Sequence, residues 1–156
     1  MNTEVLNALI VRDIIKKNRL HNEPLLHDLI DFLMDNIGNL TSVRAISDTL
    51  ASNRFNIDHK TIGRYVSALC RAFAFYRVRR YDIKGKKYLR SEDKYYLADQ
   101  SFRFARLGTK NMDYGRILEN IIAIELLRCG YEVYVEVLYK KEIDFVAMRQ
   151  GEKLYI

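Results

Sequence analysis

Acidic side chains in the last third of the chain are the residues whose types and spacing could support hydrolysis. Glu119 lies in a predicted helix, and Glu142 and Asp144 share one face of a predicted strand. Carboxylates on neighbouring elements are the ligands that a divalent ion such as Mg²⁺ prefers, and a lysine often positions the attacking water. These residues suggest a metal-dependent hydrolase with Glu119 and Asp144 as candidate metal ligands.

The elements that would hold these carboxylates are a helix and three strands. GRILENIIAIELLRCG predicts an apolar helix ending at Gly130, YEVYVEVLY and EIDFVAM alternate as strands do, and KLYI begins a third strand. A helix acid, a strand acid and then an acid-x-lysine on the third strand would form a restriction-endonuclease-like arrangement. The third strand stops at Ile156 and Lys153 lies in its turn, so we expect an incomplete site without activity. The alternative, that these acids are ordinary exposed positions, is favoured.

A second group of candidates lies on a predicted helix in the middle of the chain. In HKTIGRYVSALCRAF, apolar residues recur at intervals of three and four: Ile62, Tyr65, Val66, Leu69 and Phe73. The other side carries a polar, cationic stripe: Lys60, Arg64, Ser67 and Arg71. Such a stripe could enter the major groove of DNA, although the arginines could equally be ordinary solvated residues.

The positive charge is concentrated directly after this helix. Seven basic residues and one acid lie between Arg77 and Arg90. The net charge of this stretch is therefore +6, the same as that of the whole chain. FYRVRRYDI and DKYYLAD flank the basic run KGKKYLRSE and predict a β-hairpin. A concentrated basic patch suggests a polyanionic partner. The candidate phosphate contacts are Arg79, Arg80, Lys84, Lys86 and Lys87.

The order of the elements predicts an α+β fold. A lead-in helix from about residue 4 to 18 precedes helices near 24–36, 40–50 and 59–73, and then the hairpin. Short helices followed by a basic hairpin are typical of a winged helix-turn-helix. We therefore predict a lead-in helix at 1–22, a winged-helix domain at 23–100 and a partial nuclease-like α/β domain at 101–156.

Composition narrows the class of protein. The chain has 156 residues, is 49% apolar and contains one proline, which indicates a folded protein with a core. Neither a membrane-spanning run nor a signal peptide is visible. Cys70 and Cys129 form no CxxC pair, so we expect buried thiols in a cytoplasmic protein.

Three segments together resemble a family. YYLADQSFRFARLG, GRILENIIAIELLRCGYEVYV and KEIDFVA are similar to the C-terminal domain of unknown function of bacterial and archaeal AAA-type ATPases. NTEVLNALIVRDIIKKN resembles the helix that joins the ATPase core to that domain, and residues 61–99 resemble its winged helix. The resemblance implies a winged helix followed by a restriction-endonuclease-like fold, with Glu119 as the helix acid and Asp144 as the strand acid. No GxxxxGK[ST] loop is present, so the ATPase core is absent from this sequence.

Three functions follow as hypotheses. The first is a non-catalytic module of an AAA-type ATPase that binds double-stranded DNA. The second is a protein-interaction module that docks on the ATPase core or on another partner, and the third is a metal-dependent nuclease, inactive in this chain. We expect no cofactor: Mg²⁺ would need a complete site in the parent, and ATP would bind only to the ATPase core. The open edge of the last strand would also favour a homodimer.

Overall fold

The computed structural model describes residues 11–52, 57–82, 87–109, 113–138 and 141–156. The α+β prediction is confirmed, and each predicted helix is present, although the first residues of the lead-in helix lie outside the described part. The elements in chain order are α2 (Arg12–Asn18), α3 (Glu23–Asp35), α4 (Val43–Ser52), α5 (His59–Arg71), β1 (Phe75–Asp82), β2 (Lys87–Leu97), α6 (Gln100–Leu107), α7 (Tyr114–Arg128), β3 (Glu132–Leu138), β4 (Lys141–Arg149) and β5 (Glu152–Tyr155).

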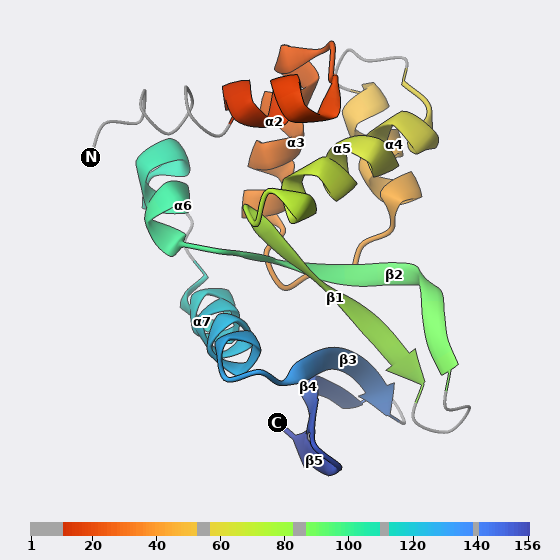
Figure 1. The fold of residues 1–156 in the computed structure, drawn as a ribbon, viewed down its shortest axis with the longest axis vertical. Coiled ribbons are helices and arrows are strands. Elements are labelled where there is room, and N and C mark those ends of the chain that lie inside the picture. Colours follow the sequence, from red (N-terminus) through yellow and green to blue (C-terminus); the bar gives the residue numbers. More distant parts are fainter. Residues whose placement is uncertain (1–10, 53–56, 83–86, 110–112, 139–140) are drawn as a thin grey trace.

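All five strands belong to one mixed sheet, in the order β2-β1-β3-β4-β5. β1 pairs with β2, β3 with β4 and β4 with β5 in antiparallel fashion, whereas β1 and β3 are parallel, with Arg79 opposite Tyr134. Parallel neighbours need a crossover connection, and the segment containing α6 and α7 supplies it (Figure 1). The predicted hairpin and the last three strands are therefore parts of one sheet.

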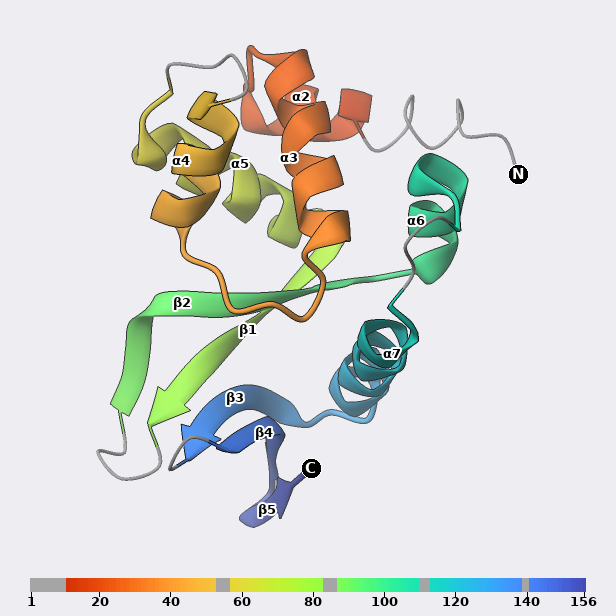
Figure 2. The ribbon, with the colours of Figure 1, turned by 180° about the vertical axis from the view of Figure 1, so that it is seen from behind.

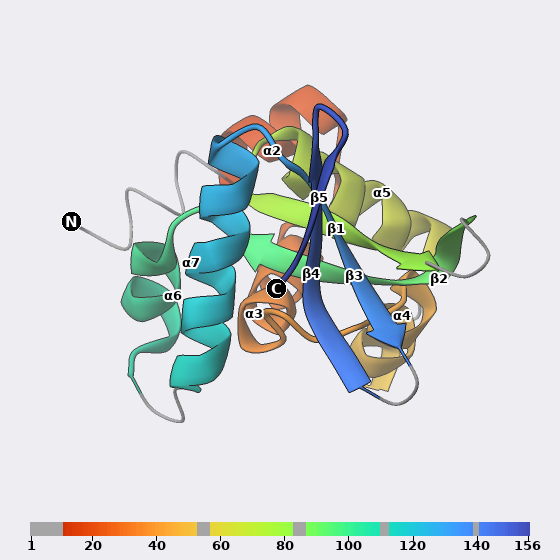
Figure 3. The same cartoon turned by 90° about the horizontal axis from the view of Figure 1, so that it is seen from below.

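The core lies mainly between the sheet and helices α2 to α5, which stack on one side of it (Figure 2). Leucine and isoleucine side chains from α3, α4 and α5 meet there with no exposed surface: Leu25, Leu29, Ile46, Ile62 and Leu69. Helix α7 lies apart from this layer, where it contacts β2, β3 and β4 (Figure 3). Two helical layers thus hold the sheet in place.

Helix α6 was not predicted. Asp99 caps it by accepting a hydrogen bond from a first-turn N–H at 2.8 Å. Arg103 is the one buried residue of α6, and its Nε donates to the carbonyl of Met34 at 3.3 Å. Arg106 forms an ion pair with Asp31 of α3. Arginines anchor α6, and its apolar residues Phe102 and Leu107 are only half-buried, so the helix has no long apolar stripe in the sequence.

The outer edge of β2 is covered by segments outside the sheet. Thr41 and Asp93 exchange two backbone hydrogen bonds of 2.9 Å, and the N–H of Gly38 donates to the carbonyl of Tyr95 at 3.2 Å. The side chain of Asn120 in α7 pairs with the backbone at the end of the strand. Unpaired edge groups invite strand addition, so this edge is protected. In the described residues no strand pairs with the far side of β5, whose four residues are exposed.

Two expectations from composition can be compared with the fold. Within the described residues, no helix is long and apolar enough to cross a membrane. Cys70 is half-buried, but Cys129 is exposed, so the prediction of two buried thiols is wrong for Cys129. The reason is position: Cys129 caps the C-terminus of α7 beyond the part of the helix that packs on the sheet.

Candidate nucleic-acid interface

Helix α5 turns its polar stripe outward. Asp58 precedes the helix and accepts a hydrogen bond from the N–H of Thr61 at 2.7 Å, which lowers the pKa of Asp58. The apolar face is buried along the helix: Ile62, Tyr65, Val66 and Leu69. On the opposite face Lys60, Arg64 and Arg71 are exposed, and Ser67 is half-buried. The two predicted stripes of this helix are therefore separated as expected.

A groove of about 490 Å³ follows this outer face. It is lined from α5, from the end of α2, from the start of α4 and from β1 by Asn18, Leu20, Val43, Lys60, Gly63, Arg64, Val66, Ser67, Arg71 and Arg77. None of these residues is acidic. Among the described residues, no ion pair joins Lys60 or Arg64 to a carboxylate. The groove thus gathers four cations and no acid among its lining residues.

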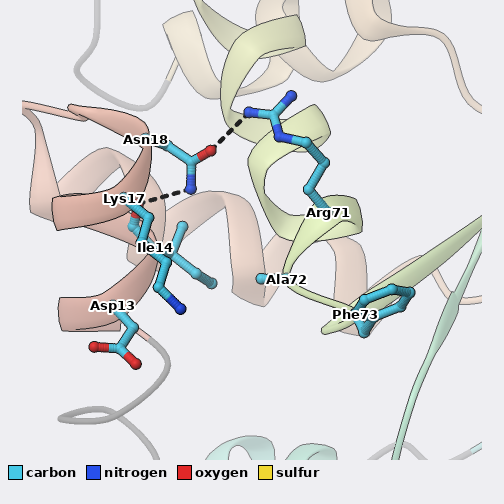
Figure 4. Close-up of a pocket in the computed structure, with 7 residues that line it drawn as sticks. All are labelled: Asp13, Ile14, Lys17, Asn18, Arg71, Ala72 and Phe73. Carbon is cyan, nitrogen blue, oxygen red and sulfur yellow. Dashed lines mark hydrogen bonds between the residues drawn. The ribbon is translucent and has the colours of Figure 1, made fainter.

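Arg71 is held in a defined direction by α2. One of its terminal nitrogens donates to Oδ1 of Asn18 at 2.7 Å, and the Asn18 amide donates to the carbonyl of Ile14 at 2.9 Å (Figure 4). Asparagine is neutral, so the bond orients the guanidinium without cancelling its charge. Asn18 was not predicted as a site residue, because its role depends on α2 packing beside the end of α5.

Arg77 joins the groove from β1. Its Nε lies 3.9 Å from a carboxylate oxygen of Asp93 on β2. Burial raises the pKa of Asp93, and the positive charges of Arg77 and Arg79 oppose that shift. Sequence reasoning counted Arg77 in the basic stretch but did not select it as a contact. Arg77 lines the groove and the neighbouring arginines of β1 do not, which becomes clear only from the position of β1 beside α5.

The predicted contacts of the hairpin are only partly described. Arg79 is exposed, whereas Arg80 is half-buried and lies 3.6 Å from a carboxylate oxygen of Glu92. The pairing of β1 with β2 is irregular between Arg79 and Tyr81. Lys84 and Lys86 lie outside the described residues, as does the side chain of Lys87. The structure therefore brings the predicted contacts of α5 together on one surface. It does not show whether the predicted contacts of the hairpin join them.

Glu119 has partners within the fold. Its Oε1 accepts hydrogen bonds from Nζ of Lys94 at 2.9 Å and from the hydroxyl of Tyr96 at 2.6 Å. The Lys94 side chain is only 2% exposed and that of Glu119 17%. Gly38 closes the site, because a Cβ there would lie 3.0 Å from Glu119 and its φ is +74°. Glu119 therefore neutralises a buried lysine and joins α7 to β2.

Asp144 lies at an irregular point of β4. Tyr134 faces Val146 and Glu136 faces Ile143, so Asp144 and Phe145 together stand opposite the single residue Val135. This two-against-one pairing is a β-bulge, which often re-aims a side chain. Asp144 is exposed, and the Glu142 side chain lies outside the described part. Among the described residues, no three histidine, cysteine, aspartate or glutamate side chains lie close enough to hold a metal ion.

Phe73 departs from the predicted apolar stripe. Helix α5 ends at Arg71, and Phe73 follows in a left-handed conformation with φ of 55°. Its side chain is 69% exposed. The prediction that Phe73 belongs to the buried face is therefore wrong, because the helix ends two residues before it.

Comparison with known proteins finds two relatives and one family. It is 40% identical over 152 residues to an uncharacterised protein of Haemophilus influenzae, covering 97% of this chain and 38% of that protein. An uncharacterised protein of Methanocaldococcus jannaschii is 26% identical over 155 residues, which cover 97% of this chain and 34% of the relative. The chain thus spans little more than a third of the length of these relatives. No solved structure matches it. Residues 2–113 match the domain of unknown function DUF8612, and the chain belongs to that family.

Proposed function

We propose that this chain is the DNA-binding module of a larger protein and that it binds duplex DNA along α5. The observation that carries the proposal is the groove in which Lys60, Arg64, Arg71 and Arg77 line one surface without an acid. Phosphate contacts from lysine and arginine supply most of the affinity of such surfaces. Ser67, in the same groove, is a side-chain type that hydrogen-bonds phosphates or bases.

The arrangement of helices supports a recognition role for α5. Helix α4 packs against α5, and the β1–β2 hairpin follows directly, as in a winged helix-turn-helix. In this proposal α5 enters the major groove and the hairpin follows the phosphate backbone. The pairing of β1 with β3 would fix the hairpin more rigidly than in an isolated winged helix.

The wider protein is also a proposal. The relatives are much longer than this chain, which agrees with a module attached to further domains. The resemblance of the sequence to C-terminal domains of AAA-type ATPases suggests that one of those domains is an ATPase core. The restriction-endonuclease-like segment would serve as a scaffold without activity, because Glu119 is engaged by Lys94 and Tyr96.

Charge reversal on α5 tests DNA binding. We expect Arg64→Glu/Arg71→Glu to weaken binding to a fluorescent 20-base-pair duplex by about 50-fold or more at 0.1 M salt, because two phosphate contacts are lost. The slope of log K against log salt should become shallower by about 1.8. Fluorescence anisotropy across a salt series measures both quantities.

The control for this experiment makes the same change in net charge elsewhere. Arg116 and Arg128 lie on α7 and pair with nearby acids. Arg116→Glu/Arg128→Glu should leave most of the affinity intact. Equal losses in the two double variants would show that only net charge matters and would contradict a site on α5.

A protein-interaction function has its own supporting observation. Helix α7 exposes an apolar stripe in which Leu118, Ile121 and Ile122 are 60%, 51% and 42% exposed. Apolar side chains gathered on one exposed face mark surfaces that bind other proteins. The proposed partner of this stripe is the ATPase core. A homodimer would instead form by pairing of β5 with β5 of a second copy.

Serine substitution on α7 tests this second proposal. Leu118→Ser/Ile121→Ser should abolish the capture of a separately expressed AAA-type ATPase core in a pull-down, while Arg64→Glu/Arg71→Glu should not. Removing two exposed apolar side chains lowers the area buried on association without disturbing the core. Undiminished capture by the serine variant would contradict a role for this stripe, and light scattering would report the homodimer by its mass.

A further inference from the structure

Phe73 combines two features that are unfavourable for the folded chain alone. It is the first residue beyond the C-cap of α5 and has φ of 55°, a conformation that favours glycine. The side chain is 69% exposed, so little burial offsets the strain. The ring contacts Tyr76 at a centroid distance of 6.3 Å. A strained residue that contributes little to packing indicates a functional role.

The surroundings of Phe73 suggest what that role is. A hollow of about 610 Å³ is lined by Asp13, Ile14, Lys17, Asn18, Arg71, Ala72 and Phe73. Arg71 and Asn18 also line the cationic groove, so the two surfaces meet at this pair. In Figure 4 the Phe73 ring lies beyond the end of α5 and points away from α2. Phe73 therefore lines the same hollow as Arg71, at the end of the cationic groove.

The length of α5 determines where this ring would meet DNA. Its 13 residues extend for about 20 Å, whereas the major groove is about 12 Å wide. With Lys60 and Arg64 over the duplex, Phe73 lies toward the outside of the groove. An aromatic ring there can stack on a base that is no longer paired, whatever its identity, because every base has a π-face.

We propose that Phe73 stacks on an unpaired base where a strand leaves the duplex held along α5. The proposal rests on the proposed DNA-binding function and makes a junction between duplex and single strand the preferred substrate. Arg71 would hold the phosphate next to the stacked base. The strain at Phe73 is then retained because a glycine, although easier to accommodate, has no ring.

Two substitutions separate stacking from folding. Phe73→Gly removes the ring and relieves the left-handed strain, so it should raise Tm by about 2–4 °C. Phe73→Trp keeps an aromatic face and the strain. The probes are a blunt duplex and a forked duplex with unpaired bases at one end, with 2-aminopurine at the first unpaired position.

The wild type should bind the fork at least about 5-fold more tightly than the blunt duplex, which corresponds to one stacked base. Binding should quench the 2-aminopurine fluorescence. Phe73→Gly should lose the preference for the fork and the fluorescence quenching, but keep its affinity for the blunt duplex. Phe73→Trp should keep the fork preference, the quenching and the affinity for the blunt duplex. A fork preference that survives in Phe73→Gly would overturn the inference while leaving the proposed function intact. Failure of the wild type to bind either DNA would instead overturn the proposed function and this inference with it.

Discussion

Replacing Glu119 with alanine is expected to lower the free energy of unfolding by about 3–5 kcal/mol. The substitution removes the carboxylate that pairs at 2.9 Å with the ammonium of Lys94, a buried charge whose side chain is only 2% exposed. The hydrogen bond from the Tyr96 hydroxyl to Glu119 is lost as well. Since a domain of ordinary stability has about 5–15 kcal/mol in total, the loss should be visible in urea unfolding followed by circular dichroism.

Two controls show whether the buried charge causes this loss. Lys94→Met/Tyr96→Phe/Glu119→Leu replaces these three side chains by apolar ones and should be more stable than the single variant, since the buried ammonium is removed together with its carboxylate. Glu125→Ala, on the same helix, removes an exposed ion pair with Arg128 and should leave the urea midpoint unchanged. A loss below about 1 kcal/mol in Glu119→Ala would contradict the importance of the cluster.

The second large effect is expected at Asn120. Its side chain accepts a hydrogen bond from the N–H of Leu97 at 2.7 Å and donates to the carbonyl of Leu97 at 2.9 Å. Both residues are buried, so Asn120→Leu leaves two backbone groups unpaired. Each costs about 1–3 kcal/mol, which predicts a loss of about 2–6 kcal/mol. Hydrogen exchange should also become faster at the Leu97 amide.

The same substitution at another asparagine supplies the comparison. Asn39 is half-buried, and its amide donates to the Asn36 side chain at 3.3 Å. Asn39→Leu should therefore cost much less than Asn120→Leu, because no strand backbone depends on it. Unchanged protection of the Leu97 amide in Asn120→Leu would show that water or a local shift replaces the side chain.

The helices were largely predictable, and the sheet was not. Helix α5 is visible in the sequence because its apolar residues follow a helical period and Asp58 caps it. Pairing of β1 with β3 leaves no local pattern, since Arg79 and Tyr134 meet only after the whole crossover has folded. The strands could be recognised one by one, but their order depends on contacts between distant parts of the chain.

The candidate sites also differ in how far the sequence predicts them. The cationic face of α5 is encoded by the spacing of Lys60, Arg64 and Arg71 and could be found without a structure. Lys94 lies in a strand-like run and gives no sign that it is buried, because its partner Glu119 is on another element. For the same reason the sequence does not indicate that Glu119 pairs with Lys94.

The parallel pairing of β1 with β3 has a large cost in chain entropy. The pairing closes a loop that contains β2, α6 and α7, so it costs more conformational freedom than the neighbouring β1–β2 turn. The cationic groove does not depend on that crossover, because its residues come from α2, α4, α5 and β1 and the segments between them. The surface proposed to bind DNA is therefore complete without β3, although its Asn18–Arg71 hydrogen bond already joins residues 53 positions apart, and the β1–β3 pairing adds a second long-range closure.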